Sequence, residues 1–537
     1  MKRLILLAFL AAAALAQPRS GGELRVAIQA EPRTLDPHLA SDEPSEIVRY
    51  LTAGALVRMN RKTQAPEPDL AVSWKIVAPG RRIRFELRPG ASFDTGKAVT
   101  PQDVCYSFVR ATDPKTDSPN GEALRGVAGA VTCAPAGAGA VELAFEKPLP
   151  QPERWMDGIA VVPAGSQPPF PALGPFRVAE VKPGVHVLLA RNPKYGRKDA
   201  GGRPLPYLDS IRLEIQRNRD FELMRFRRGE LHLVNNLDAE SFDRVRAAQP
   251  QAARNLGVSL DTEQLWFNQV PASPVAAHKK AWFQSRAFRA AVSRAIRRDD
   301  MVKVVYRGQA SPALSPVSPA NRFWHNGKVT PPPADATEAL KLLAAEGFRL
   351  AGGVLRDRTG QPVEFSIITN AGNKSRERMA ALIQQDLTEL GMRVTLAPLD
   401  FPSLIDRITK SFDYEACLLG LISSELDPNG QMNVWLSSAP NHQWNPNQKQ
   451  PATAWEAEVD KLMQAQAAEA DLKARKRAFD RVQEIAAEQA PFIYLLNRHA
   501  LVAVSEEVGN ADPVVLRPQT MWNAERLYLK AGPRAAR

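Results

Sequence analysis

The sequence alternates between strand-like and helix-like patterns along almost its whole length. The segments Glu23–Ile28 (ELRVAI), Arg82–Leu87 (RIRFEL) and Val141–Phe145 (VELAF) read as strands, and the last two place apolar residues at every second position. Other segments repeat their apolar residues at helical spacing. Strands that alternate with helices predict an α/β fold with mixed sheets.

Two of the predicted helices have recognisable ends. The segment Thr100–Asp103 (TPQD) supplies an N-cap hydroxyl, a first-turn proline and an acid that complements the helix dipole. We expect this helix to turn Val104, Phe108 and Val109 inward. Residues 374–391 predict a longer helix that ends at its glycine.

The length and composition limit the class of protein. A chain of 537 residues predicts two to four domains, because one hydrophobic core does not grow that large. Its 44% hydrophobic and 24% charged residues are typical of a soluble globular protein. No internal apolar run reaches about 18 residues, which excludes a multi-span membrane protein. Stretches rich in glycine and proline at 162–175 and turn-rich residues at 439–451 mark candidate boundaries or loops.

The N-terminus predicts export. Two basic residues precede an uncharged apolar run that extends to Leu15, and Ala14–Ala16 (ALA) fits an A-x-A cleavage pattern. We expect residues 1–16 to be a signal peptide cleaved after Ala16, and the mature chain to be periplasmic. Because no cysteine lies near this point, we expect no lipid anchor.

The basic character of the chain does not predict a nucleic-acid partner. The formal net charge of +12 falls to +10 without the signal peptide, which carries two of the basic residues. In Arg217–Glu230 and Arg286–Asp300 the bases are interleaved with acids, and apolar residues recur at helical spacing. Such segments favour solvated faces of amphipathic helices. The alternative is a basic rim that attracts an anionic ligand or membrane surface.

Catalytic motifs are missing from the sequence. Gly90–Ala98 (GASFDTGKA) departs from a P-loop in spacing and in its last residue, and Phe93–Gly96 (FDTG) has no second copy to form an aspartic-protease pair. There is no G-x-S-x-G, S-x-x-K or H-E-x-x-H, and the seven histidines are dispersed. We therefore expect no enzyme activity, no cofactor and no metal site.

The three cysteines exclude a disulfide-dense scaffold. Cys105 lies on the helix that begins at Thr100, and Cys133 lies on or beside a following strand. In an oxidising compartment these two could form a disulfide, which would leave Cys417 free.

A series of segments follows the order of one known family. The most specific is Phe85–Val104 (FELRPGASFDTGKAVTPQDV). The shorter ones are Gly21–Leu24, Pro32–Pro37, Asp69–Trp74, Gly174–Val178, Arg191–Tyr195, Pro206–Ile211, Trp266–Asn268, Phe288–Asp299 and Pro491–Leu495. Together they resemble the family 5 extracellular solute-binding proteins, the periplasmic peptide and nickel receptors of ABC importers, over nearly the whole mature chain.

The resemblance implies a fold of two lobes around a cleft, with a subdomain inserted in the first lobe. Lobe I would comprise residues 17–53, 165–261 and 498–537, the insert residues 54–164, and lobe II residues 262–497. The strand-like runs Gln264–Asn268 and Phe492–Leu496 would cross between the lobes. Such proteins close around a ligand by hinge motion.

The resemblance also points to residues of a binding site. In the family's peptide binders, a Gly-Trp pair and an acid that holds the peptide's α-amino group precede an Asp-Pro turn. In this chain the segment is Gly420–Pro428 (GLISSELDP), with Leu421 at the tryptophan position and Ser424 at the acid position. We expect Gly420 and these residues to face the ligand, with Glu425 or Asp427 able to supply the missing carboxylate.

A second acidic contact in the family often follows the Leu-Asp-Pro-His segment. Here Ser41, Asp42 and Glu43 follow that segment, so an acid lies near the expected position. Either one of the acids replaces the missing carboxylate, or the ligand has no free α-amino group there. We favour the second hypothesis, because Leu421 makes the same wall apolar.

Aromatic residues near the predicted cleft are Phe323, Trp324, Trp435 and Trp444. They either stack on a ligand or anchor loops into lobe II. Asn268 either reaches a ligand from its crossover strand or satisfies the backbone. The sequence leaves both alternatives open.

The most consistent interpretation is a periplasmic, monomeric solute-binding protein. It would capture a small solute or short peptide between two lobes and deliver it to the permease subunits of an ABC importer, without inserting into the membrane. A ligand sensor or carrier on the same scaffold is the alternative. A secreted hydrolase is less favoured, because the motifs are missing.

Overall fold

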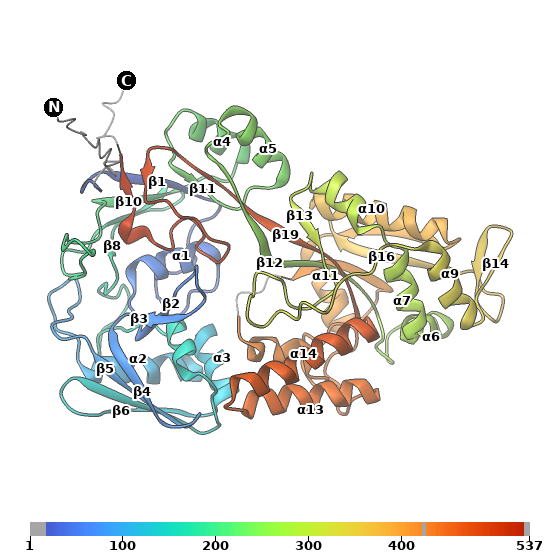
Figure 1. Ribbon diagram of the computed structural model, residues 1–537, viewed down its shortest axis with the longest axis horizontal. Coiled ribbons are helices and arrows are strands. Elements are labelled where there is room, and N and C mark those ends of the chain that lie inside the picture. Colours follow the sequence, from blue (N-terminus) through green and yellow to red (C-terminus); the bar gives the residue numbers. More distant parts are fainter. Residues whose placement is uncertain (1–17, 422–425, 531–537) are drawn as a thin grey trace, which may run out of the picture.

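Two long strands form the centre of the molecule. The computed structural model describes residues 18–421 and 426–530. In it β12 (Ala253–Phe267) and β19 (Phe492–Val504) pair antiparallel within an eleven-stranded sheet, in the order β17-β16-β18-β12-β19-β11-β1-β10-β9-β8 with β13 added to β19. Both strands run from one body of the molecule into the other (Figure 1). The sequence predicted only the ends of these strands nearest the second body.

The first body contains the N-terminal and C-terminal parts of the chain. Its strands are β1 (Glu23–Ile28), β8 (Phe176–Lys182), β9 (His186–Arg191), β10 (Ser210–Ile215) and β11 (Leu233–Val234). Its helices are α1 (Glu43–Thr52), α4 (Arg219–Arg227) and α5 (Ala239–Ala248), and β20 (Val508–Gly509) pairs antiparallel with β21 (Tyr528–Leu529). Apolar residues of β1, such as Leu24 and Val26, pack with Ile47 and Leu51 of α1 in one buried cluster.

A separate unit is inserted between α1 and β8, at the lower left of Figure 1. Its four-stranded sheet has the order β4-β5-β7-β6. The elements are β2 (Val57–Met59), β3 (Pro66–Pro68), β4 (Ala71–Ala78), β5 (Arg82–Leu87), α2 (Pro101–Thr112), α3 (Pro119–Ala128), β6 (Val131–Pro135), β7 (Ala140–Phe145) and η2 (Pro152–Gly158). It has its own hydrophobic core, which includes Phe85, Phe93 and Phe108. Its two ends lie together, because the Val161 amide donates to the Gly54 carbonyl at 2.8 Å.

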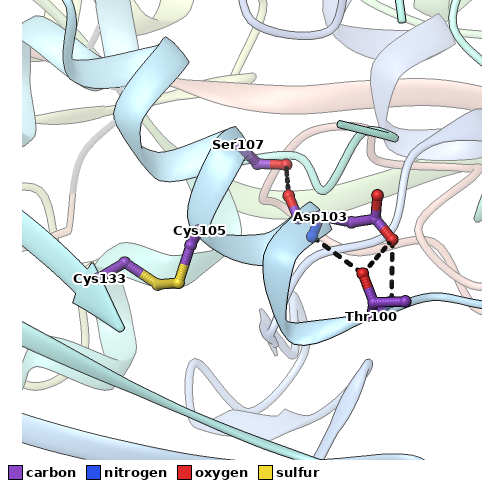
Figure 2. Close-up of a disulfide and its surroundings, with 5 residues drawn as sticks. All are labelled: Thr100, Asp103, Cys105, Ser107 and Cys133. Atoms are coloured by element: carbon purple, nitrogen blue, oxygen red, sulfur yellow. Dashed lines mark hydrogen bonds between the residues drawn. A yellow bond between two sulfur atoms is a disulfide. The ribbon is translucent and has the colours of Figure 1, made fainter. Parts of the chain in front are cut away.

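The helix α2 begins as the sequence predicted, and it carries the disulfide (Figure 2). Thr100 and Asp103 form a reciprocal capping box, in which each side chain accepts a hydrogen bond from the other residue's backbone amide. Cys105 of α2 is bonded to Cys133 of β6. The helix buries Val104 and Phe108, but Val109 is 58% exposed, so its predicted inward position was wrong. Ala111 takes the third buried place, one helical turn after Phe108.

The second body extends the central sheet on the other side of β12. It adds β18 (Ala416–Leu421), β16 (Glu364–Asn370) and β17 (Arg393–Leu399) to the sheet. Leu265 and Phe267 pack in a cluster with α7 (Arg286–Ala295) and α10 (Lys374–Glu389), whereas Trp266 packs with α13 (Ala454–Ala468) and α14 (Leu472–Gln489). Because successive strand residues point to opposite faces, helices cover both faces of this part of the sheet.

The second body also contains short elements around its core. These are α6 (Ala277–Gln284), α8 (Arg298–Asp300), β13 (Ala310–Pro312), α9 (Ala336–Ala345), β14 (Arg349–Ala351), β15 (Val354–Arg356), α11 (Phe401–Asp406), η5 (Pro428–Gln431) and α12 (Met432–Trp435). The predicted end of α10 is confirmed, since Gly391 has φ +82° just beyond it. In the described part of the chain, no helix combines the length and apolar character that a membrane crossing requires.

Candidate functional site

A cavity of about 1550 Å³ lies between the two bodies. It is lined by residues of the first body, the insert, the second body and both crossover strands, within the ranges 40–61, 119–158, 219–244, 259–263, 305–309, 324, 370–378, 426–427 and 498–519. Pockets for drug-sized ligands usually measure about 300–1,000 Å³. The cavity is therefore large enough for a ligand of several amino-acid residues.

The wall of the first body contains the predicted segment 41–43. Ser41 and Glu43 line the cavity, and the Glu43 carboxylate accepts a hydrogen bond from the Asn236 amide at 2.6 Å. The Asp42 carboxylate instead caps α1, because it accepts from the amide and the hydroxyl of Ser45 at 3.1 and 2.7 Å. Of the two acids, Glu43 is the one that faces the cavity.

A row of alternating charges follows the crossover strands at the floor of the cavity. Glu263 of β12 is 2% exposed, and its carboxylate accepts a hydrogen bond from Arg376 at 2.8 Å. The guanidinium of Arg498 on β19 lies 3.6 Å from the Glu263 carboxylate and donates to the Asp261 carboxylate at 2.8 Å. Burial alone would lower the pKa of Arg498, but Glu263 and Asp261 raise it above its usual value. These ion pairs connect Arg376 of the second body to both crossover strands at the point where the strands leave that body.

The predicted residue Gly420 lies outside the cavity lining, and the absence of a side chain there leaves room for a neighbouring ion pair. It pairs with Glu263 across β18 and β12. A Cβ atom at this position would lie 2.8 Å from the Glu263 carboxylate and closer still to the Arg376 guanidinium. A side chain at 420 would therefore displace the Arg376–Glu263 pair. Leu421, next to it, is partly buried and does not belong to the cavity lining.

Asp427 lines the cavity but is already engaged by the second body. Its two carboxylate oxygens accept from the two terminal nitrogens of Arg475 at 3.0 and 2.8 Å. Arg475 is fully buried, bonds Gln466 as well, and lies 5.1 Å over the ring of Trp324. Such a bidentate pair leaves Asp427 with little unbalanced charge for an ammonium group. Ser424 and Glu425 lie outside the described residues.

The insert contributes residues that sequence reasoning missed. Arg154 and Trp155 of η2 line the cavity, as do Arg61 and Asp157, which pair at 2.7 Å. Burial is the main cause that lowers the pKa of Arg154. Their segment, QPERWMD at 151–157, matches no known functional motif. The one signal in the sequence is a tryptophan next to charged residues, just after a proline.

The predicted aromatic and amide contacts divide into two groups. Trp324 is 3% exposed and lines the cavity, whereas its neighbour Phe323 is 43% exposed and lies outside the lining. Trp435 and Trp444 are buried against each other in the second body. Asn268 is also buried, and its amide group bonds the backbone of residues 270, 412 and 414. Trp435, Trp444 and Asn268 therefore support loops in this structure.

The described residues offer no constellation for catalysis by a thiol or a metal. Among residues 18–421 and 426–530, no three His, Cys, Asp or Glu side chains gather in a way that could hold a metal ion. Cys417 is buried, and burial raises the pKa of its thiol well above the usual value, which disfavours the reactive thiolate. The arrangement suits the enclosure of a solute.

Comparisons with known proteins agree with this geometry. The pattern of the bacterial extracellular solute-binding proteins, family 5, matches residues 65–443. The "Probable ABC transporter-binding protein" of Deinococcus radiodurans is 26% identical over 96% of this chain and 93% of its own length, and the "Oligopeptide-binding protein AppA" of Bacillus subtilis is 23% identical over 96% and 92%.

The fold is shared with a solved structure as well. The ABC transporter substrate-binding protein CtaP of Listeria monocytogenes aligns with a TM-score of 0.80 and 23% identity, over 96% of this chain and 100% of that one. The predicted α/β fold with two lobes is thereby confirmed, as is the resemblance on which it depended. On this evidence the chain belongs to the bacterial extracellular solute-binding proteins of family 5.

Proposed function

We propose that this protein captures a small solute, with short peptides as the foremost class, and delivers it to an ABC importer. The observation that carries the proposal is the cavity of about 1550 Å³ whose lining comes from both bodies, the insert and both crossover strands. A ligand enclosed there loses water on all sides when the bodies approach each other. The names of the Deinococcus and Bacillus relatives support an ABC transporter and an oligopeptide ligand, respectively.

The domain organisation that we propose keeps the boundaries expected from sequence. Lobe I consists of residues 17–53, 165–261 and 498–537, the insert of 54–164, and lobe II of 262–497. The boundaries at 261–262 and 497–498 fall within β12 and β19, which form the hinge. A ligand that contacts both lobes shifts the population toward the closed form, and the permease subunits recognise that form.

The cellular setting belongs to the same proposal. The signal peptide is cleaved after Ala16, and the mature protein acts as a monomer in the periplasm. It binds its ligand without chemical change and requires no cofactor. Intact-mass analysis of a periplasmic extract tests the cleavage site, and a retained N-terminus would contradict it.

The ligand's head group follows from the acids that remain available. Asp42 caps α1 and Asp427 is held by Arg475, so Glu43, which bonds the neutral Asn236 amide, is the described acid at these predicted positions that lines the cavity without a cationic partner. Ser424 can accept a hydrogen bond but cannot balance an ammonium charge, and a buried unpaired charge is costly. We therefore propose that the natural ligand has no free α-amino group near Ser424.

Calorimetry with a four-way peptide panel tests these points. The panel consists of tri-, tetra- and pentapeptides with free or acetylated N-termini and with free or amidated C-termini. The expected result is binding that survives N-acetylation, with a smaller radius of gyration in solution scattering when ligand is bound. Tight binding of free peptides that acetylation abolishes would contradict the head-group assignment. Hydrolysis of a bound peptide, or unchanged solute uptake after deletion of the gene, would contradict the transport function.

A further inference from the structure

Arg154 is a cavity-lining cation with few partners. Among the described residues its side chain donates one hydrogen bond, from Nη1 to the backbone carbonyl of Gln64 at 3.1 Å, and its Nε is buried without a partner. Within the described ranges, Arg154 forms no ion pair. A guanidinium has five donors, and withdrawing them from water without acceptors is unfavourable. The side chain therefore has unused hydrogen-bonding capacity on a wall of the cavity.

The acids around Arg154 do not use its hydrogen-bond donors. Asp427 across the cavity contributes attraction, but both of its oxygens are bonded to Arg475. Glu153, the preceding residue, has one carboxylate oxygen buried without a partner, and burial raises the pKa of that carboxyl. Burial first, and then the charge of Arg475, lower the pKa of Arg154. Glu153 and Asp427 both attract Arg154 electrostatically, but neither accepts a hydrogen bond from it, so most of the guanidinium donors stay available.

We propose that Arg154 binds an anionic group of the ligand, such as a carboxylate, and that the protein therefore selects solutes with an acidic end. This inference rests on the proposed function of the same cavity. Trp155 follows Arg154 in the chain, and the ring of Trp324, another lining residue, lies 5.1 Å from the guanidinium of Arg475. The part of the ligand next to its acidic group accordingly meets aromatic and apolar surface, so an apolar or aromatic side chain fits there.

The contact with Gln64 connects anion binding to closure. The Gln64 side-chain amide donates to the carbonyl of Ala320 in lobe II at 2.6 Å, and its oxygen accepts from the Arg322 amide at 3.3 Å. Gln64 holds this position with a left-handed backbone, φ +62°. An anion that fixes Arg154 also fixes the Gln64 carbonyl, and through it a contact between the insert and lobe II.

The test compares matched acids and amides. The probes are N-acetylated tri- to pentapeptides that end in phenylalanine, each as the free acid and as the C-terminal amide. We expect the wild-type protein to bind the acids about tenfold more tightly, the usual contribution of a charge-assisted hydrogen bond. Arg154→Met should bind acid and amide equally, with its affinity for the amide unchanged. Arg154→Lys should keep part of the preference, because it keeps the charge.

The control variant is Arg82→Met, since Arg82 is an exposed arginine of the insert on β5 that lies outside the cavity lining. It should keep the full preference for acids. Equal binding of acid and amide by the wild-type protein, or an undiminished preference in Arg154→Met, would overturn the inference and leave the proposed function standing. If neither protein bound any probe, both the inference and the proposed function for short peptides would fail.

Discussion

Two arginines, one in lobe II and one in the insert, interact with Asp427, and their hydrogen-bonding capacity is used to very different degrees. Arg475 of lobe II is fully buried, donates twice to Asp427 and twice to Gln466, and packs on Trp324. Within the part of the chain that the structure describes, the side chain of Arg154 in the insert donates once, to a backbone carbonyl, and has a buried nitrogen without a partner. A fully bonded charge serves the fold, whereas a charge with unused donors on a cavity wall is available to a ligand.

The strongest way to break this comparison is to remove each arginine in turn. Arg475→Met should lower the free energy of unfolding by about 3–5 kcal/mol, because it leaves Asp427 and Gln466 unpaired in a buried site. Arg154→Met should change it by about 1 kcal/mol or less, since it removes one hydrogen bond. Urea denaturation measures both. Equal losses would mean that the two arginines do not differ in role.

The insert wall depends on a covalent link that the lobe II wall lacks. Cys105 and Cys133 close a loop with a sequence separation of 28, so the double variant Cys105→Ser/Cys133→Ser should destabilise the insert by about 3.5 kcal/mol. Hydrogen exchange should increase in α2 and β6 and stay unchanged in α13 and α14. Reductant should have the same effect on the wild-type protein and no effect on the variant. Increased exchange throughout lobe II would contradict the separation of the two walls.

Acid should lower the free energy of unfolding of lobe II through Glu456 of α13. Burial would raise the pKa of Glu456, but hydrogen bonds from His442, Trp444, Gln448 and Thr453 outweigh it and lower the pKa from 4.5 to about 2. A lowered pKa means that the stabilisation is complete above pH 4.5 and is lost as the pH falls toward 2. The loss should reach up to about 3 kcal/mol. Denaturation between pH 6 and pH 2 measures it, and Glu456→Gln should remove this component of the pH dependence.

The smallest expected effect is on ligand dissociation, through the hydrogen bonds that Gln64 of the insert makes to lobe II. Gln64→Ala removes hydrogen bonds to the backbone of Ala320 and Arg322, and should speed ligand dissociation about fivefold, the equivalent of about 1 kcal/mol. Stopped-flow measurements with a bound acetylated peptide give the rate. Thr63→Ala is the control, because the Thr63 hydroxyl makes only a local 3.4 Å contact with the amide of Ala65. Identical rates in all three proteins would show that the contact does not hold the closed form.

Local chemistry was predictable from the sequence. The N-cap at Thr100 and the stop at Gly391 depend on residues that lie close together in the chain, and both appear in the structure. The crossover strands were predicted too short, because register shifts between Asn255 and Thr262 interrupt the alternating pattern of β12. An alternating apolar pattern in the sequence identifies only those parts of a strand that pair without register shifts.

The site was harder to predict, because tertiary contacts decide which side chains remain available. Asn268 was a candidate ligand contact, yet its amide is consumed by backbone groups near residues 412 and 414. Asp427 was a candidate carboxylate, yet Arg475, 48 positions away, reaches it from α14. Nothing in the sequence around Arg154 indicated that its guanidinium would be left with a single acceptor. The division of charges into structural and available ones exists only in the folded chain.

The adjacent ends of the insert have a consequence for how such receptors diversify. Because the Val161 amide bonds the Gly54 carbonyl, the polypeptide leaves lobe I and returns to it at one point. A gene could gain, lose or exchange this contiguous stretch without rethreading the rest of the protein. Gln64 and Arg154 both lie within this stretch. Grafting the stretch from one relative onto another would therefore transfer the ligand preference together with the insert.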